Sequence, residues 1–140
     1  MRRGGRVLAG MAVAAMGAVG AAQTSRSVWD GVFTAEQAKR GGEISERECV
    51  TCHGSTLSGG EEAPALEGGT FLSNWTGLTV GVLFDRIRTS MPQDDPARLT
   101  RQQDADVLAY FLSLNRFPAA KSELPAQSEV LKQIKIDAAK

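Results

Sequence analysis

The chain has 140 residues, of which 42% are hydrophobic, and this length and composition are ordinary for one globular domain. Its 16 basic and 16 acidic side chains balance, and residues 23–140 alone carry 13 basic and 16 acidic ones, a net charge of −3. Neither count has the strong positive excess of a nucleic-acid-binding protein, so that class is excluded.

The first 22 residues are typical of a secretory signal peptide. Arg2, Arg3 and Arg6 form a basic start, and an uncharged run from Val7 ends in small residues at Ala22. We expect cleavage near Ala22 and export to the periplasm, with no stable membrane insertion of the rest. An uncleaved anchor is the lesser alternative, because the 16 apolar residues fall short of a comfortable bilayer span.

Residues 23–33 are expected to form an irregular N-terminal segment, which Trp29 and Phe33 anchor. A helix is predicted over residues 35–48, because Thr34 and Gln37 have the spacing of a capping box. The pair Gly41-Gly42 lowers the helix propensity of this segment, so at least one of these glycines is expected to permit close packing.

Both cysteines of the chain follow this helix, in the run Cys49-Val50-Thr51-Cys52-His53, and His53 is the only histidine. On a helical turn, positions i, i+3 and i+4 share one face, so the two thiols and the imidazole point the same way. In an exported protein this run is typical of covalent haem attachment. It predicts one haem c, bonded to Cys49 and Cys52, with His53 as an axial ligand of the iron.

Three other interpretations of this run are weaker. A structural zinc site needs four ligands, whereas residues 23–140 contain three Cys or His residues. A thioredoxin-like redox pair belongs to alternating strands and helices, which the flanking sequence does not indicate. A simple disulfide between Cys49 and Cys52 leaves the adjacent His53 as a coincidence.

Residues 54–78 have no helical or strand period and are expected to form a long loop. A haem would supply apolar surface around which this loop could pack. A helix is predicted over residues 80–88, where one apolar stripe consists of Val80, Leu83, Phe84 and Ile87.

Met91 is the one methionine outside the predicted signal peptide. A thioether is the usual second axial ligand of a haem iron when no further histidine is present. The Met91-Pro92 step lies among polar residues at the end of a predicted helix, which favours a loop position over a gap-filling core methionine. Met91 is therefore the predicted sixth ligand, with a lysine or an open position as alternatives.

The last predicted helix covers residues 101–115, with a capping box at Thr100 and Gln103 and Pro118 beyond its end. Residues 34–118 would then form the domain, and residues 119–140 a C-terminal extension that is packed on it or partly flexible. No strand is clearly indicated, so the fold class is all-α.

Several segments together follow a known pattern. They are the helix with Gly41, Cys49-Val50-Thr51-Cys52-His53-Gly54, Pro64-Ala65-Leu66, Ile87-Arg88-Thr89-Ser90-Met91-Pro92, and Asp106-Val107-Leu108-Ala109-Tyr110-Phe111-Leu112. With these segments the sequence resembles a class I c-type cytochrome over most of residues 34–118. The resemblance implies the cytochrome c fold, in which three main helices and their loops surround one covalently bound haem.

The resemblance also implies two contacts. A glycine of the first helix lets an aromatic of the last helix approach closely, which corresponds to Gly41 and Tyr110 here. The family usually has an aromatic one turn after that glycine, whereas this chain has Ser45, a departure that bears on how closely the two helices cross. The carbonyl group of Pro64 would accept the His53 Nδ1 proton and so orient the ligand.

Haem propionates need hydrogen-bond donors, and the candidates are Asn74, Trp75, Arg86 and Arg88. A solvated position on the helix is the stronger expectation for both arginines. The acidic residues of the loops are expected to face water; they are Glu61, Glu62, Glu67, Asp94 and Asp95. Asp94 and Asp95 lie close to Met91 in the sequence, so this pair is a candidate for shaping partner docking.

These features predict a periplasmic electron carrier, which is not an enzyme and has no catalytic residue. Residues 71–75 and 86–88 resemble small exported cytochromes of periplasmic dehydrogenases, so the expected partners are such a dehydrogenase and an oxidase or another cytochrome. A monomer is expected. The alternatives are a haem enzyme or gas sensor with an open sixth position, and a small subunit whose haem mainly serves folding within a larger complex.

Overall fold

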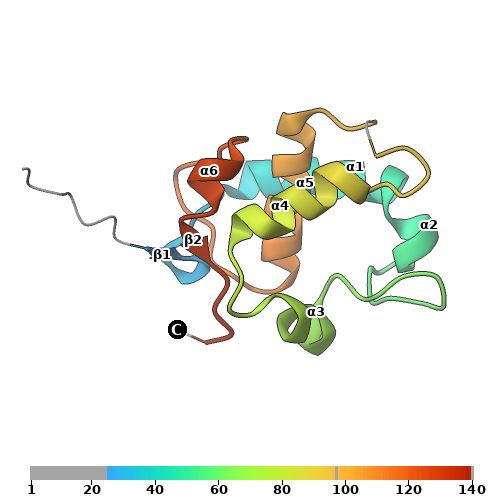
Figure 1. Ribbon diagram of the computed structural model, residues 1–140, viewed down its shortest axis with the longest axis horizontal. Helices are drawn as coiled ribbons and strands as arrows, with labels where there is room; N and C mark the ends of the chain where they lie inside the picture. Colours follow the sequence, from blue (N-terminus) through green and yellow to red (C-terminus); the bar gives the residue numbers. More distant parts are fainter. Residues whose placement is uncertain (1–24, 97, 140) are drawn as a thin grey trace, which may run out of the picture.

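The structure is a computed structural model that describes residues 25–96 and 98–139, so the predicted signal peptide lies outside the described residues. Helices dominate the described part, with little strand, and the all-α prediction is confirmed (Figure 1). In chain order the elements are β1 (Arg26–Ser27), the 3₁₀ turn η1 (Val28–Asp30), α1 (Ala35–Glu48), α2 (Val50–His53), α3 (Gly68–Trp75), α4 (Val80–Ser90), α5 (Arg101–Leu114), α6 (Ser128–Leu131) and β2 (Ile134–Lys135).

Helices α1 and α5 cross in direct contact, and Gly41 makes this crossing possible (Figure 1). A Cβ atom on Gly41 would overlap the backbone carbonyl group of Asp106 and lie 2.9 Å from the Cβ atom of Tyr110. The implied pairing of Gly41 with Tyr110 is thus present. Ser45 is buried and donates a hydrogen bond of 2.8 Å to the Gly41 carbonyl oxygen, so a small polar residue here is compatible with a close crossing.

Helix α4 confirms the predicted apolar stripe, because Val80, Leu83, Phe84 and Ile87 are all buried. Thr79 caps its first turn by accepting a hydrogen bond from the Val82 amide. The helix continues to Ser90, so Met91 is the residue that ends it.

The expectation of a loop over residues 54–78 was wrong for α3. This short helix buries Phe71 alone, and its first amide, at Gly68, is satisfied by the side chain of Asn115, 2.9 Å away. Two short strands are also present that no sequence signal clearly indicated: β1 and β2 form a parallel pair of two residues each. Both elements depend on distant parts of the chain, which a local period does not report.

The C-terminal extension packs on the domain, where it buries Leu124, Leu131, Ile134 and Ile136. The buried amide of Gln37 exchanges two hydrogen bonds with the backbone of Leu124, of 3.0 Å and 2.7 Å. Because the side chain of Gln37 bonds to Leu124, it does not cap helix α1, and only the Thr34 half of the predicted capping box forms.

Among the described residues, none of the helices has both the length and the apolar character that a membrane span needs.

Gly41→Ala is expected to lower the free energy of unfolding by about 1–3 kcal/mol, because a methyl group has no room against the α5 backbone. The control is Gly69→Ala in α3, where an added Cβ atom meets nothing within 4 Å, and which should be neutral or stabilising by up to about 1 kcal/mol. Denaturant unfolding of both variants measures the difference. Equal effects at the two positions would contradict this account of the crossing.

Candidate functional site

One helical turn gathers the two thiols and the imidazole. Cys49 ends α1 and begins α2, whose last residue is His53. The Cys49 carbonyl oxygen accepts the amide of Cys52 at 3.3 Å and that of His53 at 3.0 Å. Both cysteines are free thiols; Cys52 is exposed, whereas Cys49 is half-buried, and this burial raises the pKa of the Cys49 thiol.

The imidazole of His53 is buried and has a defined hydrogen bond. Its Nδ1 atom lies 2.7 Å from the carbonyl oxygen of Pro64, which is the contact that the resemblance implies. A carbonyl oxygen only accepts, so Nδ1 carries the proton and donates it. In the neutral ring the Nε2 atom then has the lone pair that a metal-ligating imidazole requires.

The loop after His53 turns back so that Pro64 reaches the imidazole. The amide of Gly59 donates to the His53 carbonyl oxygen at 2.9 Å, and the amide of Leu66 donates to that of Leu57 at 2.8 Å. Gly59 has a φ of +86°, and a Cβ atom on it would lie 2.7 Å from the amide nitrogen of Ala65. A glycine is required here, because any larger residue would push the Pro64-Ala65 peptide away.

Met91 directly follows α4, and its amide donates to the Ile87 carbonyl oxygen at 2.9 Å. Its side chain is half-buried. Residues 91–96 and 98–100 form the Met91 segment, which lies at the same end of the molecule as α2 (Figure 1). An ion pair of 3.0 Å between Arg98 and Glu48 joins this segment to the residue before Cys49. The structure thus places the Met91 segment next to the peptide that carries the two thiols.

Among the propionate candidates, Arg88 has the most telling environment. Its Nη1 atom is buried and has no hydrogen-bond partner among the described residues, and its guanidinium lies 5.9 Å from the centre of the Phe84 ring. A fully solvated position was the stronger expectation for Arg88, so this burial is a departure from it. Arg86 and Asn74 are exposed, and Trp75 is half-buried with its ring centre 6.4 Å from that of Phe71.

Asp104 is a buried acid that sequence reasoning missed. Its side chain is 2% exposed, and its Oδ1 atom has no partner within the described part of the chain. Burial raises its pKa to about 6, and the charges of Arg88 and Arg101 oppose this rise. Its place in the first turn of α5 gave no signal, because acids at helix N-termini are ordinarily solvated.

The other acidic residues follow the expectation in part. Glu61, Glu62, Asp94 and Asp95 are exposed, whereas Glu67 is half-buried at the start of α3.

The residues present fit a covalently bound haem. Two thiols and a buried imidazole with a free Nε2 lone pair lie on one turn, and a half-buried thioether lies on the neighbouring segment. The unpartnered Nη1 atom of Arg88 is a donor of the kind that a haem propionate needs. No group of three or more His, Cys, Asp or Glu residues that could hold a metal ion occurs among residues 25–96 and 98–139, so the geometry gives no support to zinc.

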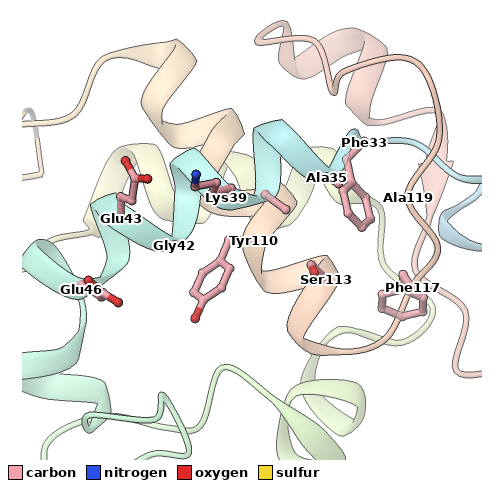
Figure 2. A pocket seen from close by; sticks show the side chains of 11 residues that line it. Phe33, Ala35, Lys39, Gly42, Glu43, Glu46, Tyr110, Ser113, Phe117 and Ala119 are labelled. Atoms are coloured by element: carbon pink, nitrogen blue, oxygen red, sulfur yellow. The ribbon is translucent and has the colours of Figure 1, made fainter.

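A separate groove of about 530 Å³ runs along the α1–α5 crossing (Figure 2). Phe33 and Phe117 line one end of the groove and Glu46 the other, with Tyr110 between them. Gly42 leaves the ring of Tyr110 uncovered by a side chain on α1. None of the predicted haem-binding residues lines this groove, so it is distinct from the site.

Comparison with known proteins adds a family assignment. The model of the family described as cytochrome c oxidase, cbb3-type, subunit III matches residues 36–111, which include α1 from its second residue, both thiols, His53 and Met91. No curated protein and no solved structure matches the chain.

Asp104→Asn is expected to stabilise the protein at about pH 8 by roughly 1–2 kcal/mol, with the gain vanishing towards about pH 4. The pKa of Asp104 is raised from 3.8 to about 6, so its ionisation costs stability as pH rises through this interval, and the cost is fully present above it. Denaturant unfolding across this range measures the effect. As a control, Asp106→Asn breaks the 3.0 Å ion pair with Arg40 and should destabilise the protein at about pH 8. A gain from Asp104→Asn that does not change with pH would contradict the assignment.

Proposed function

Because the chain belongs to the family described as cytochrome c oxidase, cbb3-type, subunit III, we propose that it carries single electrons on one covalently bound haem c. The cytochrome c domain makes haem-based electron transfer its general function. The finer proposal is a class I cytochrome whose iron has His53 and Met91 as axial ligands.

The hydrogen bond between His53 and Pro64 is the observation that carries the proposal. In this 2.7 Å bond the Nδ1–H group donates to the carbonyl oxygen, which fixes the ring orientation and leaves Nε2 of the neutral ring as the coordinating atom. Cys49 and Cys52 lie on the same turn, where their thiols would form the two thioether bonds to the haem. Cys52 is exposed, which supports an attachment point near a surface that a redox partner could reach.

When bound, the haem supplies reversible one-electron chemistry at its iron. Met91 would fill the sixth position, so that the chain itself occupies both axial sites and leaves none for a substrate. Arg88 would donate a hydrogen bond from its unpartnered Nη1 atom to a propionate and balance the negative charge of that group. The chain's residues therefore hold, orient and partly enclose the group, and none of them is assigned a catalytic role.

The proposed setting is the periplasm, reached through the signal peptide predicted over residues 1–22. A periplasmic dehydrogenase would supply the electrons, and an oxidase or another cytochrome would accept them. Contacts between redox partners are small and short-lived. The net charge of −3 on residues 23–140 would give only modest electrostatic steering, so the transfer rate should depend weakly on salt.

The family description favours one further candidate, an electron-transfer subunit within an oxidase complex. Purification tests it, because a carrier would be isolated as a stable monomer that equilibrates with redox mediators. A subunit would be isolated with other chains or would be unstable without them.

The central test is the absorption spectrum of protein produced with the cytochrome maturation machinery. A carrier ligated by His53 and Met91 should have a c-type spectrum when reduced and a weak sulfur-to-iron charge-transfer band when oxidised. Its reduced form should not react with carbon monoxide. Met91→Ala should lose the band and bind carbon monoxide. If the wild-type protein were high-spin and bound carbon monoxide at once, the carrier would give way to an enzyme or gas sensor. A protein without covalent haem would contradict both.

Arg88→Met is expected to lower the reduction potential by about 20–60 mV, because loss of a half-buried positive charge favours the more positive ferric site. The matched control is Arg86→Met on the same helix, where the exposed guanidinium is screened by water and the change should be smaller. Redox titration of the two variants provides the comparison. Equal shifts would remove the special role of Arg88.

A further inference from the structure

We propose that Arg98 is a positioning residue, which holds the Met91 segment against the haem-attachment peptide and thereby keeps the methionine sulfur on the iron. This inference rests on the proposed ligation by His53 and Met91. It assigns a role to a residue that lies outside the set of haem-binding candidates.

The guanidinium of Arg98 joins two parts of the chain that are 50 residues apart. Its Nη1 atom donates to Glu48 Oε2 at 3.0 Å, and its Nη2 atom donates to Asp94 Oδ2 at 2.6 Å. Its Nε atom lies 3.8 Å from Asp95 Oδ2. One side chain thus bridges the last residue of α1 and two acids of the Met91 segment.

Both ends of this bridge lie next to the proposed haem contacts. Glu48 immediately precedes Cys49, and its side chain is only 18% exposed, which distinguishes it from the freely solvated acids of the loops. On the other side, Asp94 is three residues after Met91. The Arg98 bridge therefore acts on the separation between the thiol-bearing turn and the methionine.

The Met91 segment also has apolar contacts, since Pro92 is buried and Leu99 packs against the core. On the N-terminal side, Met91 is held by its hydrogen bond to Ile87 at the end of α4. Beyond it, the backbone makes short-range turns, in which the Asp95 amide donates to Pro92 and the Arg98 amide donates to Asp95, both at 3.1 Å. These bonds shape the segment but do not attach it to α1, whereas the pair of Arg98 with Glu48 does.

The guanidinium geometry matters as well as the charge. An exposed ion pair contributes little to global stability, so removing it should change unfolding only slightly. The same small energy matters more for the local equilibrium between the bound and detached positions of the methionine, because the free-energy difference of that equilibrium is smaller than that of unfolding. Arg98 serves two acceptors on different segments with separate N–H groups, and a lysine ammonium would do this less well.

The test is a titration of the oxidised holoprotein with imidazole, which competes with Met91 for the sixth position. Loss of the sulfur-to-iron band measures the binding of imidazole. Arg98→Gln should raise the imidazole affinity by about fivefold, with Arg98→Lys in between. The control is Lys132→Gln, which removes a surface cation that also pairs with two acids, Glu129 at 2.9 Å and Asp85 at 3.8 Å. Its imidazole affinity should stay within about twofold of wild type.

A double-mutant cycle with Glu48→Gln separates positioning from general destabilisation. If the pair acts as a unit, Glu48→Gln alone should raise the imidazole affinity, and the double variant should add little to either single change. Unchanged affinity in Arg98→Gln, or the same rise in Lys132→Gln, would overturn the proposal. These outcomes differ from failure of the proposed function, in which the wild-type protein itself would lack the band, and that result would overturn both.

Discussion

The hydrogen bond from His53 Nδ1 to the carbonyl oxygen of Pro64 determines the chemistry of this site. It selects the tautomer whose Nε2 lone pair is free, and it locks the ring plane before any metal arrives. The loop that supplies the carbonyl folds back through Gly59, where only a glycine fits against the following peptide. The ligand, the loop and the thiol-bearing turn are therefore one structural unit.

Two further contacts relate this unit to the rest of the domain. The close crossing at Gly41 sets the position of α1, whose last residue leads directly into Cys49. The Arg98–Glu48 pair then joins the end of α1 to the segment that follows Met91. The residues proposed to ligate the iron from opposite sides are thus each tied to the same end of α1.

Much of this architecture could be predicted from local signals. Helices α1, α4 and α5 carry caps, an apolar period or both within their own sequence, and the Cys-x-x-Cys-His run is contiguous. Helix α3 escaped prediction because its first amide is satisfied by Asn115, which is 47 residues away. The burial of the Arg88 Nη1 atom and of Asp104 could not be predicted for a similar reason, since packing between helices determines which polar atoms are shielded from water. Local patterns thus indicated which residues could bind the haem, whereas the environment of their neighbours required the fold.

The central claim is that this chain supplies both axial ligands, and proton NMR of the reduced holoprotein tests it most directly. The methyl group of a methionine bound to a low-spin ferrous haem lies over the porphyrin, and the ring current of the porphyrin shifts its proton signal far upfield. With Met91 bound, the wild-type protein should give one such three-proton signal, and Met91→Ala should lack it. A wild-type spectrum without that signal, or a signal that persists in Met91→Ala, would contradict the account.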